Sequence, residues 1–414
     1  MLFAHVLRHI VQTGRLTAFD AHGHEHVFSG SPGANLTIRF HDPSLHWKLF
    51  FNPGLYLGEA YMDGTFTVED GTIFDFLDFI TANMDSSGEH PMMAWVAAAD
   101  TLFRRIQQYN PASRARKNVA HHYDLNGRLY ELFLDRDRQY SCAYFQTPHD
   151  SLDTAQLNKK RHLAAKLMIE PGMKVLDIGC GWGGLGIYLA GELGAQVTGL
   201  TLSTEQLGVA RERAAKAGLS DRVEFHLRDY REQTGTFDRI VSVGMFEHVG
   251  ITHFQEYFNT VKSLLTEDGV ALIHTIGRSE VPRATNPWIR KYIFPGGYVP
   301  ALSEVMRSVE QTRLITTDVE ILRLHYAETL KHWRHRFRKR RDDAKALYDE
   351  RFCRMWEYYL AASECSFRNM DSVVFQIQLT KKRDVLPLTR DYITEWEKRA
   401  NRRQKASTRD GAAA

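Results

Sequence analysis

Long apolar runs are missing from this 414-residue sequence, and no uncharged stretch approaches the roughly 20 residues of a membrane-spanning helix. The segment from Met1 to Arg8 also lacks the basic start, long apolar core and small-residue cleavage site of a secretory signal peptide. We therefore expect a cytoplasmic protein, and we expect any contact with a membrane to be peripheral.

Cysteine and excess charge are also scarce. The four cysteines are scattered, with the spacing of neither a metal site nor a disulfide framework, which favours a reducing compartment. A net charge of +3 does not indicate a nucleic-acid partner. The apolar fraction of 43% and the charged fraction of 25% are those of an ordinary globular protein, and the length suits two domains. We expect neither a metal nor nucleic acid.

Changes in sequence pattern divide the chain into four parts. Residues 1–105 combine helical and strand patterns without a catalytic constellation, which predicts a small α+β domain for docking or dimerisation. Residues 106–120 are expected to form a linker, and residues 121–398 the catalytic domain. The polar, Arg-rich residues 399–414 are expected to be a disordered tail.

From residue 173 to about residue 280, short apolar strands alternate regularly with helical patterns. This order predicts an α/β fold with a doubly wound parallel sheet. Two further strands, the last of them reversed, would complete a seven-stranded sheet. The expected strands span residues 173–178, 196–202, 223–227, 238–243, 269–276, 317–324 and 372–380.

A glycine-rich turn, Val175-Leu-Asp-Ile-Gly-Cys-Gly-Trp-Gly-Gly184, includes the first of these strands. Glycines let the backbone turn sharply and approach a ligand closely, and the helix that follows directs its N-terminal amides into the turn. The spacing fits two templates. One is the dinucleotide pattern G-x-G-x-x-G, and the other is the D-x-G-x-G-x-G pattern of S-adenosylmethionine (SAM) methyltransferases, here formed by Asp177, Gly179, Gly181 and Gly183.

The end of the second strand bears on this choice. A dinucleotide fold needs an acidic residue about 20 positions after the glycines to bind the ribose. Thr201 and Ser203 occupy that edge, and the first acid, Glu205, is already on the helix. This weakens the dinucleotide interpretation, although many methyltransferases favour an acid there as well. Ser203 and Gln206 also fit the helix-capping pattern S-x-x-Q, so Gln206 has two interpretations, a cap or a ribose ligand.

Polar residues also follow the later strands of the predicted sheet. Ligands of open α/β sheets bind at the carboxyl ends of the strands. Each of these residues has an ordinary interpretation of its own, as a solvated loop residue or a buried core histidine, but their gathering at one edge is the arrangement of an active site. They are Asp229, Tyr230, Glu247, His248, His274 and Tyr326.

Six motifs of the chain, including the glycine-rich turn, follow one another in a characteristic order. They are Tyr140-Ser-Cys-Ala-Tyr144, Val175 to Gly184, Thr201-Leu-Ser-x-x-Gln206, Ser242 to Gly250, His274-Thr-Ile-Gly277 and His325-Tyr-Ala-x-Thr-Leu330. In this order they resemble the motifs of cyclopropane-fatty-acyl-phospholipid synthases and of the related mycolic acid cyclopropane synthases. The resemblance covers residues 118–380, and the N-terminal part is similar to the extra domain of the bacterial phospholipid enzymes. One local departure is Asn126-Gly127, which reverses the family's usual Gly-Asn pair.

The resemblance implies a Rossmann-like, seven-stranded SAM-dependent methyltransferase fold with a smaller α+β N-terminal domain. It implies a bicarbonate ion held by Cys142, Glu247, His274, Ile276 (through its backbone) and Tyr326. It implies SAM as cosubstrate, held by Tyr140, Ser141, Val175, Asp177, Gly179, Gly181, Gly183, Thr201, Gln206, Asp229 and Tyr230.

The implied reaction transfers a methylene group from SAM to the cis double bond of an unsaturated phospholipid acyl chain. It forms a cyclopropane ring, with bicarbonate as the base. The alternative is C-methylation of the same chain without ring closure. The implied partners are membrane phospholipids at the inner face of the cytoplasmic membrane and a second copy of the chain in a homodimer. The basic run from Lys331 to Arg341 is either a solvated helix face or a surface that attracts anionic lipid headgroups.

Overall fold

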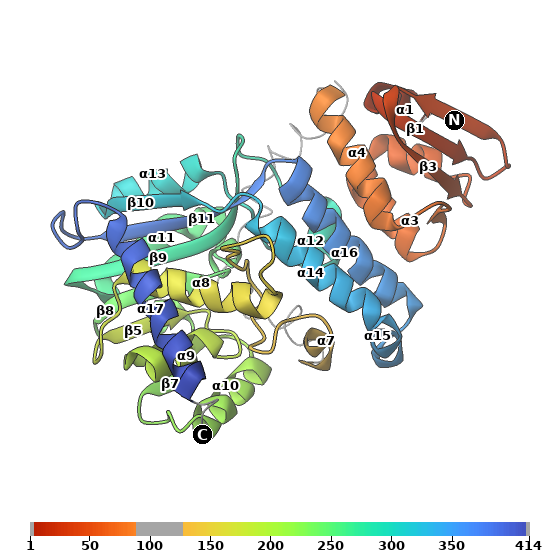
Figure 1. The fold of residues 1–414 in the computed structure, drawn as a ribbon. Coiled ribbons are helices and arrows are strands. Elements are labelled where there is room, and N and C mark those ends of the chain that lie inside the picture. The colour runs from red at the N-terminus through yellow and green to blue at the C-terminus, as the bar shows by residue number, and fades with distance from the viewer. Residues whose placement is uncertain (1–3, 88–126, 411–414) are drawn as a thin grey trace.

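The computed structural model describes residues 4–87 and 127–410 (Figure 1). The expected linker at residues 106–120 lies outside these ranges. Within them, no helix combines the length and the apolar character that crossing a membrane requires. All four cysteines of the chain are buried and free.

The N-terminal unit is a four-stranded sheet with helices, and its strand order is β2-β1-β3-β4. β1 is parallel to β3, whereas β2 and β4 run antiparallel to their neighbours. Alternate residues such as Leu16 and Ile38 enter its core, and the expected α+β architecture is confirmed. Its elements are α1 (Ala4–Ile10), β1 (Thr13–Phe19), β2 (Glu25–Ser29), β3 (Ser31–Phe40), α2 (Leu45–Phe51), α3 (Pro53–Met62), β4 (Phe66–Val68) and α4 (Ile73–Ser87).

The second unit is built on a seven-stranded sheet with the order β10-β11-β9-β8-β5-β6-β7 (Figure 1). β11 is antiparallel to both of its neighbours, and the pairs among the strands from β5 to β9 are parallel. The predicted α/β sheet with a reversed last strand is thereby confirmed. The strands are β5 (Lys174–Ile178), β6 (Gln196–Thr201), β7 (Val223–Leu227), β8 (Phe237–Val243), β9 (Leu265–Arg278), β10 (Ile315–Ile321) and β11 (Ser372–Thr380).

Helices cover both faces of this sheet (Figure 1). Consecutive residues of β5 point to opposite faces, so Val175 enters the core with α8, α9 and α10, and Leu176 enters the core with α11 and α13. The helices are α7 (Gly127–Glu131), α8 (Leu152–Leu167), α9 (Gly184–Leu193), α10 (Thr204–Lys216), α11 (Phe254–Leu264), α12 (Pro287–Tyr292), α13 (Leu302–Thr312), α14 (His325–Lys339), α15 (Arg341–Leu347), α16 (Glu350–Asn369) and α17 (Asp391–Asp410), with short 3-10 turns η1 (Tyr230–Glu232), η2 (Phe246–His248) and η3 (Ile251–His253).

The C-terminal segment differs from the expected disordered tail. α17 continues to Asp410, so the described part of residues 399–414 is helical. α17 packs across α8 on the outside of the sheet (Figure 1). With the sheet on one side and α17 on the other, α8 buries nearly all of its residues, including Lys159 and Lys166. A helix with so many polar residues is buried because a distant segment covers it.

The two units meet where α3 and α4 pack against α16 and α12 (Figure 1). Gly58 of α3 lies directly on the fully buried indole of Trp288 in α12. A Cβ atom at Gly58 would lie 2.5 Å from Trp288 Nε1, which is closer than real contacts allow. The small residue is therefore what lets the two helices approach.

We expect Gly58→Ala to lower the free energy of unfolding by about 1–3 kcal/mol, because the added methyl group overpacks this contact. Gly208→Ala is the matched control, since a Cβ atom there meets nothing within 4 Å. That variant should be neutral or stabilising by up to about 1 kcal/mol, because alanine favours a helix. Urea unfolding of both variants measures the difference, and equal losses would contradict the close contact.

Candidate active site

A cavity opens at the carboxyl ends of β5, β6 and β8, the edge at which open α/β sheets bind ligands. Two predicted cosubstrate residues, Val175 and Gly183, are not on its wall, and none of the predicted bicarbonate residues is. The predicted residues that do line the cavity are Tyr140, Ser141, Asp177, Gly179, Gly181, Thr201, Gln206, Asp229 and Tyr230.

The glycine-rich turn forms part of this wall through Gly179 and Gly181. Their φ angles of 87° and 54° are in the left-handed region that favours glycine. Gly183 also has a positive φ, 81°, but it begins α9, and a Cβ atom there would lie 2.7 Å from the ring of buried Phe225. Val175 is fully buried in the same core. Gly183 and Val175 thus shape the turn from behind.

The end of β6 resolves the two interpretations of Gln206. Ser203 caps α10, because its Oγ accepts a hydrogen bond from the Gln206 backbone N–H at 3.3 Å. The Gln206 side chain does not accept a hydrogen bond from the Ser203 backbone N–H, which donates to Thr201 Oγ1. Its Oε1 instead accepts from the Thr201 hydroxyl at 2.9 Å. This leaves the Gln206 amide nitrogen as the group that the side chain can offer to a ligand in the cavity.

Asp177, on β5, is buried at the cavity wall. Among the described residues, its Oδ2 has no hydrogen-bond partner. Burial raises the pKa of this carboxyl group to about 7, against the lowering effect of the Lys159 ammonium. Because an unpaired buried carboxylate is costly, a cationic group of a ligand would supply the partner that the protein does not.

Asp229 and Tyr230 follow β7 and close the next part of the wall. Asp229 forms an ion pair with Arg231, with its Oδ2 2.7 Å from Arg231 Nη2 and its Oδ1 2.9 Å from Arg231 Nε. The Tyr230 ring packs edge-on against Tyr257, with centroids 5.2 Å apart. The ion pair and the ring contact fix both side chains before a ligand arrives.

The segment that contains Tyr140 and Ser141 closes the opposite wall. The Tyr140 hydroxyl lies 2.8 Å from the hydroxyl of Tyr359 on α16, and its ring stacks on Trp333 of α14 at 5.1 Å. The long helices that reach toward the N-terminal unit therefore also hold the cavity wall.

Behind the cavity, Glu247 lies on η2 between the wall residues Met245 and His248. Its Oε1 accepts a hydrogen bond from the Ile276 backbone N–H at 2.6 Å. Its Oε2 is buried without a hydrogen-bond partner in the part of the chain that the structure describes. Burial raises the pKa of this carboxyl group to about 7, so it exchanges a proton near neutral pH.

His274 lies two residues before Ile276 on β9, so the two side chains share one face of the strand. Gln376 Nε2 donates to His274 Nδ1 at 3.1 Å, which leaves the proton of the neutral ring on Nε2. Burial, reinforced by nearby cations, lowers the pKa of His274 to about 3. The ring is therefore neutral at physiological pH.

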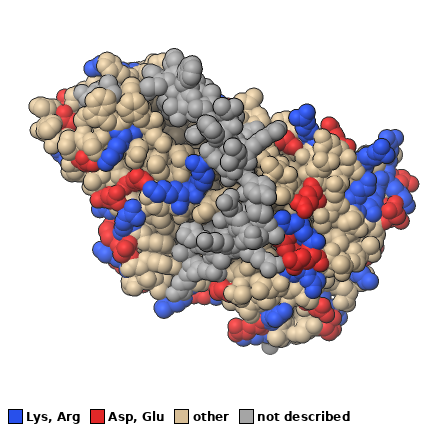
Figure 2. Space-filling model, turned by 180° about the vertical axis from the view of Figure 1, so that it is seen from behind, with Lys and Arg blue, Asp and Glu red and all other residues tan. Residues whose placement is uncertain are grey.

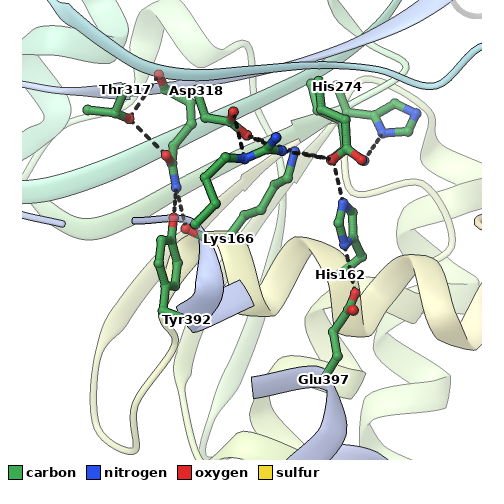
Figure 3. A network of polar contacts seen from close by, with 11 residues as sticks. His162, Lys166, His274, Thr317, Asp318, Tyr392 and Glu397 are labelled. Carbon is green, nitrogen blue, oxygen red and sulfur yellow. Dashed lines mark hydrogen bonds and ion pairs between the residues drawn. The ribbon is translucent and has the colours of Figure 1, made fainter. Parts of the chain in front are cut away.

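A polar network lies beside His274, between α8, β10 and α17 (Figure 3). His162 bridges two acids, with 2.7 Å from Nε2 to Glu320 Oε2 and 2.7 Å from Nδ1 to Glu397 Oε1. The Lys166 ammonium lies 2.5 Å from the same Glu320 oxygen. Through His162, the network connects Glu397 of α17 to Glu320 of the edge strand β10. His274 lies on β9 of the same sheet.

Cys142 and Tyr326 come together through α14. Thr329, one turn after Tyr326, accepts a hydrogen bond from the Ala143 backbone N–H at 3.0 Å. Both Cys142 and Tyr326 are buried in one apolar cluster against which Ile276 packs. Burial raises the pKa of the Cys142 thiol well above its usual value, so the thiol is neutral. Of the predicted bicarbonate residues, Glu247 and Ile276 are in direct contact, and Cys142, Glu247, His274 and Tyr326 are buried.

Several residues that line the cavity are not among the predicted site residues, and Lys159 and His248 are two of them. Lys159 is a buried lysine of α8, and His248, noted without a role, has its pKa lowered to about 4 by burial. No motif marks Lys159, because the polar pattern of α8 shows no apolar face. Such a pattern usually indicates a solvated helix, so the sequence contains no signal for a buried lysine.

The basic run from Lys331 to Arg341 is largely neutralised by acids. Arg334 pairs with buried Glu364 at 2.9 Å, Arg336 with Asp153 at 2.8 Å, and Arg341 with Glu350 at 2.6 Å. Acidic and basic side chains also lie next to one another over the face that Figure 2 shows. Much of the positive charge of the run is therefore used in ion pairs within the protein.

The strand order with one reversed strand, the glycine-rich turn beside the central strand and the cavity at its end together define a SAM-dependent methyltransferase. The model of the family described as mycolic acid cyclopropane synthetase matches residues 111–377. The chain belongs to this family.

Individual relatives agree with this assignment. The chain is 37% identical over 354 residues to a probable fatty acid methyltransferase of Pseudomonas putida, covering 82% of this chain and 86% of the relative. It is also 37% identical over 355 residues to the cyclopropane-fatty-acyl-phospholipid synthase of Escherichia coli, covering 86% and 90%. The solved structure of the cyclopropane synthase MmaA2 from Mycobacterium tuberculosis is 31% identical and has a TM-score of 0.62, covering 66% of this chain and 99% of that one.

Proposed function

We propose that this enzyme transfers a methylene group from SAM to the cis double bond of an unsaturated phospholipid acyl chain and closes a cyclopropane ring. The Glu247 carboxyl group carries the proposal. It is buried next to the methyl-donor cavity, held by Ile276 and left with one unpartnered oxygen among the described residues. A group that exchanges a proton near pH 7 suits a reaction in which a proton must leave after methyl transfer. The names of the two 37%-identical relatives both support an acyl chain as the substrate.

We assign cavity residues to the α-ammonium group, the ribose and the adenine of SAM. We assign Asp177 to the α-ammonium group, because its carboxylate lacks a partner among the described residues. The turn at Gly179 and Gly181 lets the backbone approach the ligand. We assign the Gln206 amide to the ribose and the Tyr230 ring to the adenine, because both residues line the cavity.

The proposed reaction has two steps, methyl transfer and ring closure. The alkene attacks the sulfonium methyl carbon, the C–S bond breaks with its electrons remaining on sulfur, and S-adenosylhomocysteine and a carbocation on the acyl chain result. Loss of a proton from the added methyl group then provides the electron pair for the second C–C bond of the ring. Because an isolated alkene is a weak nucleophile, the cavity must hold both reactants in line and exclude water.

We propose that the buried side chains of Glu247 and His274 hold an anion that carries one proton. A bound bicarbonate ion would supply the base that removes the proton from the added methyl group. His274 presents an Nε2–H donor, and Glu247 Oε2 donates when it is protonated and accepts when it is not. The Ile276 N–H is already taken by Glu247, so Ile276 acts by orienting that carboxylate.

The competing product is a methyl-branched chain that keeps a double bond, formed when the proton leaves from a chain carbon instead. Both products add one CH2, so mass does not distinguish them. We expect NMR of an unsaturated phospholipid incubated with SAM and enzyme to show cyclopropane protons and loss of the alkene signals. Alkene signals retained beside a new methyl branch would replace ring closure with C-methylation.

The substrate also requires the enzyme to reach acyl chains within a bilayer. We therefore propose peripheral contact with phospholipid membranes, and we retain the homodimer as a prediction. Helix α2 exposes Trp47 and Phe51, whose rings stack at 6.3 Å, and such aromatic side chains favour a membrane interface.

A further inference from the structure

Lys159 is a cation in the wall of the cosubstrate cavity. Its side chain extends from α8 and is 1% exposed. Its Nζ donates hydrogen bonds to Gln139 Oε1 and to Ser141 Oγ, each at 2.7 Å. A buried ammonium group held in this way is costly unless the surrounding charges balance it.

The neighbouring turn of α8 reinforces these contacts. Gln156 lies three residues before Lys159 on the same face of the helix, and its Nε2 donates to the backbone oxygens of Ser141 at 2.9 Å and Gln139 at 3.3 Å. Side-chain and backbone atoms of the 139–141 wall are therefore both fixed by one face of α8.

Charged and titratable groups approach Lys159 from several elements. The acids Asp135 and Asp137 lie in the turn before the wall, and Lys160 adds a like charge from α8 itself. Among the groups nearby, Asp177 is the carboxylate that has no hydrogen-bond partner in the described chain. The groups coupled to Lys159 are Asp135, Asp137, Lys160, Cys142, Asp177 and His274.

We propose that Lys159 is a positioning residue of the SAM site. Its ammonium group holds Gln139 and Ser141 in the cavity wall and supplies the positive charge that keeps Asp177 ionised for the α-ammonium group of SAM. The inference rests on the proposed use of the cavity for SAM, and it adds a residue that no motif of the chain identifies.

Lys159→Met tests this role, because methionine keeps an unbranched side chain and removes the charge. We expect it to weaken binding of S-adenosylhomocysteine by about 50-fold in isothermal titration calorimetry at pH 7.5, the scale of a lost buried charged contact. Binding of 5′-methylthioadenosine, which lacks the amino-acid part, should change by less than about threefold, because it makes no use of Asp177.

Lys160→Met is the matched control. Lys160 is the next residue of the same helix, is also buried and pairs with Asp137 Oδ2 at 2.6 Å, but it does not line the cavity. We expect its affinity for S-adenosylhomocysteine to stay within about threefold of wild type. Circular dichroism and thermal unfolding of both variants show whether each is folded.

The pH dependence of binding provides a second readout. Burial lowers the pKa of Lys159 to about 8, and the pKa of Asp177 is raised to about 7. Affinity for S-adenosylhomocysteine should therefore fall below pH 7, where Asp177 takes up a proton, and above pH 8, where Lys159 loses one. In Lys159→Met the alkaline fall should vanish and the acid midpoint should move upward, since the cation that stabilises ionised Asp177 is gone.

The outcomes separate the possible failures. Equal weakening of S-adenosylhomocysteine and 5′-methylthioadenosine would mean that Lys159 only maintains the cavity, and an unchanged affinity or pH profile would overturn the inference. If the wild-type protein bound neither ligand, the proposed function itself would fail.

Discussion

Glu247→Gln is expected to lower turnover by about 10³-fold, the usual scale of a lost proton-transfer contribution. Glutamine keeps an oxygen that accepts from the Ile276 N–H, so the local structure persists, but it cannot exchange a proton at the second position. S-adenosylhomocysteine should still bind within about threefold of wild type, because Glu247 does not line the cosubstrate cavity. Product formation under single-turnover conditions and calorimetric binding measure the two quantities.

The same variant has a predicted signature in stability. The folded-state pKa of Glu247, about 7, is above the usual value, so this carboxyl group makes the protein less stable as pH rises from about 4.5 to 7. Glu247→Gln should therefore unfold at a higher temperature than wild type at pH 8, and the difference should shrink below pH 5. Glu310→Gln, an exposed position on α13, is the control for both measurements. A variant that keeps wild-type turnover would show that Glu247 has no part in the chemistry.

Gly183→Ala is expected to lower the free energy of unfolding by about 2–5 kcal/mol. The left-handed backbone at φ 81° costs an alanine about 1–2 kcal/mol. The new Cβ atom would also lie 2.7 Å from the Phe225 ring and 2.9 Å from Ala210 Cβ, which adds overpacking of about 1–3 kcal/mol. Urea unfolding at pH 7.5 measures the loss.

Gly181→Ala is the comparison within the same turn. Its φ of 54° imposes a similar backbone cost, but a Cβ atom there meets nothing within 4 Å and would project into the cavity. We expect the free energy of unfolding of Gly181→Ala to be at least about 1 kcal/mol higher than that of Gly183→Ala. We also expect Gly181→Ala to lose more affinity for S-adenosylhomocysteine. The reverse order of the two variants in stability would contradict the assignment of Gly183 to the core.

The predicted wall of the cavity illustrates what a sequence can show. Asp177 and Thr201 lie at the ends of β5 and β6, and Tyr230 follows β7. A parallel sheet brings the carboxyl ends of its strands to one edge. Their meeting therefore followed from strand order alone. Val175 and Gly183 belong to the same motif but lie in the core. Val175 shares a face of β5 with Asp177 but is farther from the carboxyl edge. Gly183 is the N-cap residue of α9 and packs against Phe225.

Lys159 illustrates what the sequence could not show. α8 carries Asn158, Lys159, Lys160 and Lys166 without an apolar stripe, and such a pattern usually indicates a solvated helix. It is buried because the sheet lies on one side of it and α17 packs on the other. The Lys159 ammonium itself is held by Gln139 and Ser141, and the helical pattern of α8 does not indicate which of its faces meets that segment.

The sequence by itself determined the α/β sheet, the family and nine residues of the cavity wall. Strand periodicity and glycine spacing are local properties, and the sheet places the ends of its strands at one edge. The tertiary structure decided which charged side chains are neutralised by ion pairs and which titratable groups have a shifted pKa. Arg334 and Arg336 are neutralised by Glu364 and Asp153, distant in sequence, whereas burial leaves Glu247 able to exchange a proton near neutral pH. Such effects depend on desolvation and on partners that only folding brings together.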